Sequence, residues 1–411
     1  MDTLTRRRFL IASGVAGGAA LAAGASAVTW EQLHKQAAVA PLPSDSRILV
    51  VVTLYGGNDG LNTVIPYADP AYHSARPELA YSESDVLRLD SALGLNPAMT
   101  GLAKLWTSKQ LAIVRGVGYP NPDHSHFRSM DIWQTASPAE PLNTGWIGRW
   151  LDATGDDPIR AVDVGSTLPP LVVGARCTAA SLDVGKQSPL PASSAAAFTA
   201  LAATSSGDTA PQRQVRESYA AERKVAATFD PVLDPSAPTS ADEAPAASSA
   251  GGQNNLKGQL DLVGRCVKAG VPTRVYSVSL GGFDTHADEK SSQQAQLGSF
   301  DTAVSGFLTD MAADPRGRNV VLLAYTEFGR RVAANASQGT DHGTAGPVFV
   351  AGARVKGGFY GDQPSLTDLN AGDLKVTTDF RAIYAELAES VLGIDPGRVI
   401  SGAPKPLGLL T

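Results

Sequence analysis

The sequence is poor in cysteine and in basic residues. It contains 2 cysteines among 411 residues, too few for a scaffold held together by disulfides. Cys177 and Cys266 could form one bond in an oxidising compartment or could both be core residues, and the sequence leaves these alternatives open. The formal net charge is -6, because 40 acidic residues outnumber 34 basic ones. Nucleic-acid binding needs clustered lysine and arginine, so we expect no nucleic-acid partner.

Long apolar runs are also scarce after the first thirty residues. No later stretch is long and apolar enough to span a bilayer, and no repeat of the solenoid type occurs. The chain is long enough for one large α/β domain or two ordinary ones.

The N-terminus contains the three parts of an export signal in order. Arg6 and Arg7 stand shortly before Phe9 and Leu10, an apolar stretch rich in Ala and Gly covers 11–23, and a small-x-small cleavage pattern lies at 25–27. Paired arginines at this place are typical of the twin-arginine class. We therefore expect residues 1–27 to be removed. The mature chain, without a transmembrane anchor, is then expected to be periplasmic or extracellular.

The rest of the chain alternates between short apolar runs and helical patterns. The expected strands are 47–54, 111–117, 273–280, 319–325 and 347–351, and the expected helices are 98–108, 125–135, 255–269, 290–313 and 379–392. A continuous apolar run such as 47–54 is typical of a strand buried on both faces. The alternation predicts a three-layer α/β sandwich with a mostly parallel, doubly wound sheet.

One region interrupts this alternation. Residues 187–254 are rich in Ala, Ser, Thr, Pro and Gly and contain few large apolar residues. Such a composition cannot bury much core, which predicts a loose insertion or lid within a single domain at 45–400. A helix-like pattern at 214–228 is the one candidate for order inside it.

Acidic residues and histidines gather directly after the expected strands. Four of the six histidines lie in these loops, at positions 124, 126, 286 and 342. Ligands bind at the carboxyl ends of the strands in an open parallel sheet, and Asp, Glu and His suit Zn²⁺, Mn²⁺, Mg²⁺ or Ca²⁺. The sequence therefore predicts a divalent metal site with one or two ions. The candidate ligands are Asp59, Asp284, His286, Glu327, Asp341 and His342.

Each of these motifs taken alone has a structural explanation. Asp59 suits an Asx turn, and Ser125 suits a helix N-cap. Glu327 could pair with Arg330 or Arg331. The shared-site interpretation rests on four separate loops carrying such residues to one edge of the sheet.

The motifs together resemble a known bacterial family. A twin-arginine signal, GGNDGLN at 56–62, SHF at 125–127, GGFDTH at 281–286, TEFGR at 326–330 and GTDHG at 339–343 are similar to the family called domain of unknown function 1501. The similarity extends from about 47 to 393. That family resembles a branch of the alkaline phosphatase and sulfatase superfamily. The run DHG at 341–343 followed by PVFVAG at 347–352 is similar to a sulfatase segment.

The resemblance implies roles for individual residues. Ser125 matches a nucleophile at a helix N-terminus, and the metal ligands match at Asp59, Asp284, His286, Asp341 and His342. Three departures stand against it. The spacing between Asp284 and His286 is short, Glu327 rather than Asp341 stands directly at a strand end, and no histidine follows 342.

The function implied is that of an exported metal-dependent hydrolase of phosphate or sulfate esters. Ser125 would attack the ester, and His124 or His126 would bind the anion or protonate the leaving group. Asn58 and Arg128 are candidate contacts to an anionic ester substrate. The alternative is a non-catalytic, metal-containing protein that binds envelope or polysaccharide material with an exported partner. A metal-free serine hydrolase is disfavoured, because no G-x-S-x-G motif surrounds Ser125.

Overall fold

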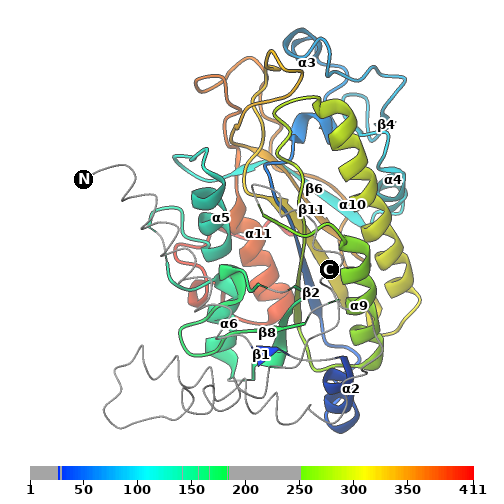
Figure 1. The fold of residues 1–411 in the computed structure, drawn as a ribbon, viewed down its shortest axis with the longest axis vertical. Coiled ribbons are helices and arrows are strands. Elements are labelled where there is room, and N and C mark those ends of the chain that lie inside the picture. The colour runs from blue at the N-terminus through cyan, green and yellow to red at the C-terminus, as the bar shows by residue number, and fades with distance from the viewer. Residues whose placement is uncertain are drawn as a thin grey trace, which may run out of the picture.

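A ten-stranded sheet forms the centre of the protein (Figure 1). The computed structural model describes residues 26–27, 30–140, 142–155, 157–165, 167–182, 184 and 251–411. The strands follow the order β1 (Ser26–Ala27), β8 (Ala180–Ser181), β7 (Ala161–Asp163), β9 (Val275–Leu280), β2 (Ile48–Leu54), β10 (Val320–Thr326), β11 (Gly346–Ala351), β6 (Leu111–Gly118) and β12 (Gly358–Tyr360), with β13 (Thr378–Asp379) also pairing with β6.

The sheet is parallel except at one strand. β11 is antiparallel to both of its neighbours, β10 and β6, and every other pairing is parallel. The expected mostly parallel α/β sheet is confirmed. Apolar periodicity does not reveal strand direction, so the reversal of β11 could not be predicted.

The central strands are buried on both faces, as their continuous apolar sequences predict. Val50 and Val52 of β2 pack into one core cluster, whereas Leu49 and Val51 pack into the other. Successive side chains of a strand point to opposite faces, so the two clusters mark the two sides of the sheet.

Helices cover both faces and complete the three layers (Figure 1). One face carries α2 (Trp30–Val39), α4 (Thr100–Thr107), α9 (Leu256–Ala269) and α10 (Glu289–Ala312). The other carries α5 (His126–Thr135), α6 (Trp146–Thr154) and α11 (Phe380–Leu387), which continues as a π-helical turn at Ala388–Leu392.

Smaller elements lie beyond the end of β2. A short 3-10 helix, η1 (Gly60–Asn62), leads into a second sheet of β3 (Val64–Ile65), β5 (Gly94–Leu95) and β4 (Leu87–Arg88), with α3 (Pro70–Ala75) between β3 and β4. Further 3-10 turns lie at Pro158–Arg160, Pro170–Val172, Gly317–Asn319 and Pro396–Arg398. A separate apolar cluster, which includes the fully buried Tyr72, supports this region.

Several expectations concern residues outside this description. The export signal lies there apart from Ser26–Ala27, and so does the expected insertion apart from 251–254. Among the described residues, no helix has the length and apolar character needed to cross a membrane. Cys177 and Cys266 are buried without a disulfide between them, and they belong to the core clusters on opposite faces of the sheet.

A candidate metal centre at the carboxyl end of the sheet

Three side chains from separate loops converge at the carboxyl ends of the strands. His126 is the first residue of α5 after β6, Asp284 follows β9, and His342 lies between β10 and β11. Each offers one ligand atom, and these atoms all lie within 4.8 Å of one another. The Nε2 atoms of His126 and His342 lie 3.5 and 3.3 Å from Asp284 Oδ1. Two imidazoles and a carboxylate form a donor set suited to a divalent ion.

His286 adds a fourth donor to these three residues. Its Nε2 lies 3.1 Å from Asp284 Oδ1 and 2.9 Å from Nε2 of His342. Two ring nitrogens at this separation can share at most one proton between them. We refer to His126, Asp284, His286 and His342 as the metal cluster.

Each imidazole of the metal cluster has an acceptor behind it. His126 Nδ1 lies 2.7 Å from Glu327 Oε1, and His342 Nδ1 lies 2.7 Å from the carbonyl oxygen of His124. His286 Nδ1 lies 3.5 Å from Asp341 Oδ1. An Nδ1–H donated outward leaves the lone pair on Nε2, which is the tautomer that binds a metal.

His126 Nε2 is a buried nitrogen without a hydrogen-bond partner. Buried polar atoms normally have partners, so an orphaned ring nitrogen facing a carboxylate and two further imidazoles requires an explanation. A bound cation supplies one. The residues present therefore fit a metal ion, with His126, Asp284 and His342 as the residues that would hold it and His286 as a further ligand.

Glu327 supports the metal cluster from behind. Its side chain is fully buried, and its carboxylate accepts hydrogen bonds from Gly56 N–H and Thr326 Oγ1, each at 2.9 Å. Together with the contact to His126, these bonds fix the carboxylate. The sequence suggested Glu327 as a ligand or as a partner of Arg330 or Arg331, and the structure places it as the acceptor that orients His126.

Arg330 is the buried cation beside the metal cluster. Its guanidinium donates to Asp284 Oδ1 at 2.8 Å and to the carbonyl oxygens of Gly57 and Thr340 at 2.6 and 2.8 Å. Burial acts to raise the pKa of Asp284, but the hydrogen bond and charge of Arg330 hold that pKa below its ordinary value. Asp284 is therefore ionised and available as a ligand.

His342 is kept neutral by its surroundings. Burial lowers the pKa of its imidazole, and the charges of Arg330 and His126 add to this effect against the hydrogen bond with the His124 carbonyl. A neutral imidazole is the form that binds a metal.

Two glycines allow the loop after β2 to approach the metal cluster. Gly57 has φ of +67°, and a Cβ there would lie 2.3 Å from the ring of Phe328. That ring packs 4.9 Å from the imidazoles of both His126 and His342, centroid to centroid. Gly56 has φ of +117°, and its Cβ would lie 2.4 Å from the Asp284 nitrogen. The pair of glycines at 56–57 is therefore required by close packing.

Asp59 is not brought to the metal cluster. Its carboxylate forms a fully buried salt bridge with Arg76, which also donates to the carbonyl oxygen of Val332 at 2.7 Å. Burial acts to raise the pKa of Asp59, but the charge of Arg76 outweighs it and holds this pKa below its ordinary value. The neighbouring Glu289 shows the opposite result, because burial and the charge of Asp59 raise its pKa to about 9. The expected ligand is thus already paired with an internal cation, and its part in metal binding stays a prediction without geometric support.

Two of the expected catalytic residues, Ser125 and His124, lie at the rim, whereas the third, His126, lies in the metal cluster as a candidate ligand. Ser125 is exposed, precedes α5, and its hydroxyl makes no capping hydrogen bond. Its backbone N–H donates to Asp123 Oδ1 at 2.7 Å. The exposed ring of His124 lies with Nε2 2.9 Å from Oδ2 of the buried Asp373. Asp373 has no place in the sequence motifs, and only its position in space reveals it.

The two expected substrate contacts differ in exposure. Asn58 is 2% exposed. Its side-chain Nδ2 donates to Thr63 Oγ1 at 2.9 Å, and its Oδ1 accepts from Gln293 Nε2 at 3.1 Å. Such a side chain supports the loop and does not reach a ligand at the surface. Arg128 is half-buried in the first turn of α5 and stays a candidate. Asp341 is exposed and touches the metal cluster only through His286.

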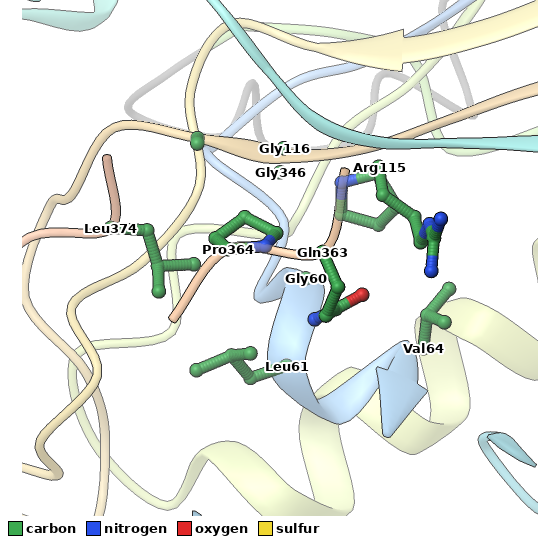
Figure 2. Close-up of a pocket in the computed structure, with 11 residues that line it drawn as sticks. Gly60, Leu61, Val64, Arg115, Gly116, Gly346, Gln363, Pro364 and Leu374 are labelled. Atoms are coloured by element: carbon green, nitrogen blue, oxygen red, sulfur yellow. The ribbon is translucent and has the colours of Figure 1, made fainter. Parts of the chain in front are cut away.

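A small cavity is lined by residues of η1, β6 and β11 (Figure 2). Gly60, Leu61, Arg115, Gly346 and Pro364 are among the residues that line it, and none of the candidate ligands does. Its volume is about 30 Å³, which is enough for one or two water molecules. It is too small for an ester substrate, so it is not the functional site.

Three solved structures are similar to the chain at low identity. A protein of the alkaline phosphatase superfamily from Vibrio parahaemolyticus is 11% identical with a TM-score of 0.41, and the match covers 92% of this chain and 78% of that one. Alkaline phosphatase from the Antarctic bacterium TAB5 is 10% identical with a TM-score of 0.36, covering 76% and 92%. Ps i-CgsB in complex with k-i-k-neocarrahexaose is 9% identical with a TM-score of 0.40, covering 89% and 75%. At this level the matches bear on neither reaction nor substrate.

The comparison with protein families gives a match over most of the chain. Residues 46–403 match the model of a family described as a protein of unknown function, DUF1501. A search of curated proteins finds no match.

Proposed function

Since the chain belongs to the DUF1501 family, whose description assigns no activity, we propose from the geometry of the metal cluster that it is a metal-dependent hydrolase of phosphate or sulfate esters. The observation that carries the proposal is the buried, unpartnered Nε2 of His126. It faces Asp284 and His342, and its ring is oriented by the buried carboxylate of Glu327. This is the arrangement of a ligand with its supporting shell.

The cation would supply Lewis-acid chemistry when bound. Near it lie the buried guanidinium of Arg330 and the first turn of α5 with its backbone N–H groups. Backbone N–H groups at the start of a helix favour negatively charged ligands. These features favour an anionic ester over a neutral one.

Ser125 and His124 are the residues proposed for bond-breaking. Ser125 stands one residue before the ligand His126, and its hydroxyl is exposed and makes no capping bond. We assign it the attack on phosphorus or sulfur, which forms a serine ester as the bond to the alcohol oxygen breaks. The ring of His124, with Nε2 2.9 Å from Asp373 Oδ2, is assigned transfer of the Ser125 hydroxyl proton to that departing oxygen, and water would then hydrolyse the serine ester. His126 is less suited to that step, because both of its ring nitrogens are directed inside the site.

Metal analysis of the purified full chain tests the centre. We expect a divalent ion in stoichiometric amount, its loss in His126→Ala and Asp284→Asn, and its retention in His73→Ala. His73 is a matched control because it is exposed on α3, where its Nε2 lies 2.8 Å from the Tyr67 carbonyl oxygen. A chain that folds normally and holds no divalent ion after supply with Zn²⁺, Mn²⁺ and Mg²⁺ would rule the proposal out.

Activity assays test the reaction separately. Aryl phosphate and aryl sulfate should be cleaved by the metal-loaded chain, and Ser125→Ala should abolish turnover while the metal content stays unchanged. If Ser125→Ala kept the activity of the wild type, only the covalent attack by Ser125 would be ruled out, and the metal-dependent hydrolase would stand. Retention of metal without turnover of any ester, alongside tight binding of a glycan or an exported protein, would favour the binding role.

We also propose export by the twin-arginine route, on the sequence pattern at 5–27. Replacing Arg6 and Arg7 together by lysine should retain the protein in the cytoplasm, as measured by cell fractionation and immunoblotting. Unchanged appearance outside the cytoplasm would show that another signal directs the chain.

A further inference from the structure

Phe127 is an exposed aromatic side chain that directly follows His126 of the metal cluster in the sequence. It lies between His126 and Arg128 in the first turn of α5, and 79% of its surface is exposed. Among the residues that the structure describes, it is the only exposed Phe, Tyr or Trp. All the others described are buried or half-buried, so its exposure is not a general property of this surface.

The packing of α5 does not explain this exposure. The helix already buries Met130, Ile132 and Trp133 against the core below the sheet. Phe127 nevertheless stays exposed, as does Asp131 four residues later. A large apolar ring held in water is unfavourable, and a smaller polar residue would serve the helix equally well.

The residues before Phe127 carry charge and hydrogen-bonding groups. His124 and Ser125 directly before it are exposed, and His126 turns inward to the metal cluster. Because Phe127 follows His126 directly in the first turn of α5, we expect a ligand whose anionic group reaches the cluster to extend its remaining part past this turn. A flat apolar ring at that place suits a ligand that itself has a flat or C–H-lined face.

We propose that Phe127 is a platform for the alcohol part of the ester, and that the substrates are esters of ring alcohols, either aryl or sugar. This inference rests on the proposed function, because the platform matters only where an anionic group is held at the metal cluster. Phe127 takes no part in bond-breaking. It selects substrates by the surface that they place on it.

Binding to the Zn²⁺-loaded full chain tests the platform without turnover. Methyl phosphate, phenyl phosphate and glucose 1-phosphate share one anionic group and differ in the attached alcohol, and isothermal titration gives the affinity of each for Ser125→Ala, which prevents hydrolysis. We expect at least one ring phosphate to bind about 2- to 10-fold more tightly than methyl phosphate. The relative affinities of phenyl and glucose phosphates distinguish aryl from sugar substrates.

Substitutions at Phe127 complete the test. Phe127→Ala in the same background should abolish the preference and leave methyl phosphate unchanged, Phe127→Tyr should retain it, and Leu142→Ala, at another exposed apolar residue, should have no effect. The inference is overturned by equal affinities for all three probes, by a preference that survives Phe127→Ala, or by a Phe127→Ala effect confined to self-association in sedimentation. Absence of binding of both methyl phosphate and methyl sulfate would instead remove the proposed function, and this inference with it.

Discussion

Replacing Asp163 by asparagine should make the protein more stable at neutral and alkaline pH. Asp163 ends β7 at the carboxyl edge of the sheet, is 6% exposed, and has no salt-bridge partner among the described residues. Burial raises the pKa of its carboxyl from 3.8 to about 7, while a hydrogen bond from Ser277 acts in the opposite direction. The folded chain therefore holds this proton at a pH where the unfolded chain has released it.

The magnitude follows from this difference in proton affinity. Stability falls as pH rises through the window from about 4 to 7, because the folded state binds the proton more tightly than the unfolded state. Each tenfold difference in proton affinity amounts to about 1.4 kcal/mol, so the full loss above pH 7 is up to about 4 kcal/mol. Between pH 5 and pH 8 the expected loss is about 3 kcal/mol.

Denaturation in urea at pH 5, 6, 7 and 8, with a chelator present, measures this effect. The free energy of unfolding of Asp163→Asn, minus that of the wild type, should rise steadily through the series. Asp261→Asn is the matched control, because Asp261 is exposed and pairs with Lys257 on the surface. Parallel curves for Asp163→Asn and the wild type would refute the argument that an unpaired carboxyl is buried here.

Three further predictions concern the site. Glu327→Gln should lower metal affinity by about 10- to 100-fold in isothermal titration with unchanged circular dichroism, because the acceptor behind His126 is weakened; an unchanged affinity would show that the ring needs no such support. Arg76→Met should cost about 3–5 kcal/mol of unfolding free energy in urea, because Asp59 is left buried and unpaired, and Asp59→Leu in the same chain should restore most of it. Chelation should lower the free energy of unfolding of the wild type by about 2.7 kcal/mol relative to metal at 100 times Kd, and an equal loss in His126→Ala would place the ion elsewhere.

The sequence predicts the central strands well for a physical reason. β2, β6, β9 and β10 begin and end within two residues of the expected runs, because strands buried on both faces must be apolar throughout. β7 and β8 have only 3 and 2 residues, so they leave no periodic signal to read. The small sheet after η1 was not predicted for the same reason.

The site could be predicted in location and only partly in role. The rule that ligands bind at the carboxyl ends of parallel strands leads to the loops whose side chains His126, Asp284 and His342 converge in the structure. Which carboxylate faces the cluster depends on where the cations lie, and sequence spacing does not show that. Asp59 is taken by Arg76, and Glu327 supports an imidazole, through contacts that only the folded chain reveals.

The hydrogen bonds of Arg330 have a consequence for the order of events during folding. One guanidinium joins carbonyl oxygens of Gly56, Gly57, Phe283 and Thr340, so it ties together loops that are up to 284 positions apart in the chain. No fragment that ends before residue 342 contains all the donors of the centre. Uptake of a metal ion should therefore come last, and it would report that nearly the whole chain has reached its place.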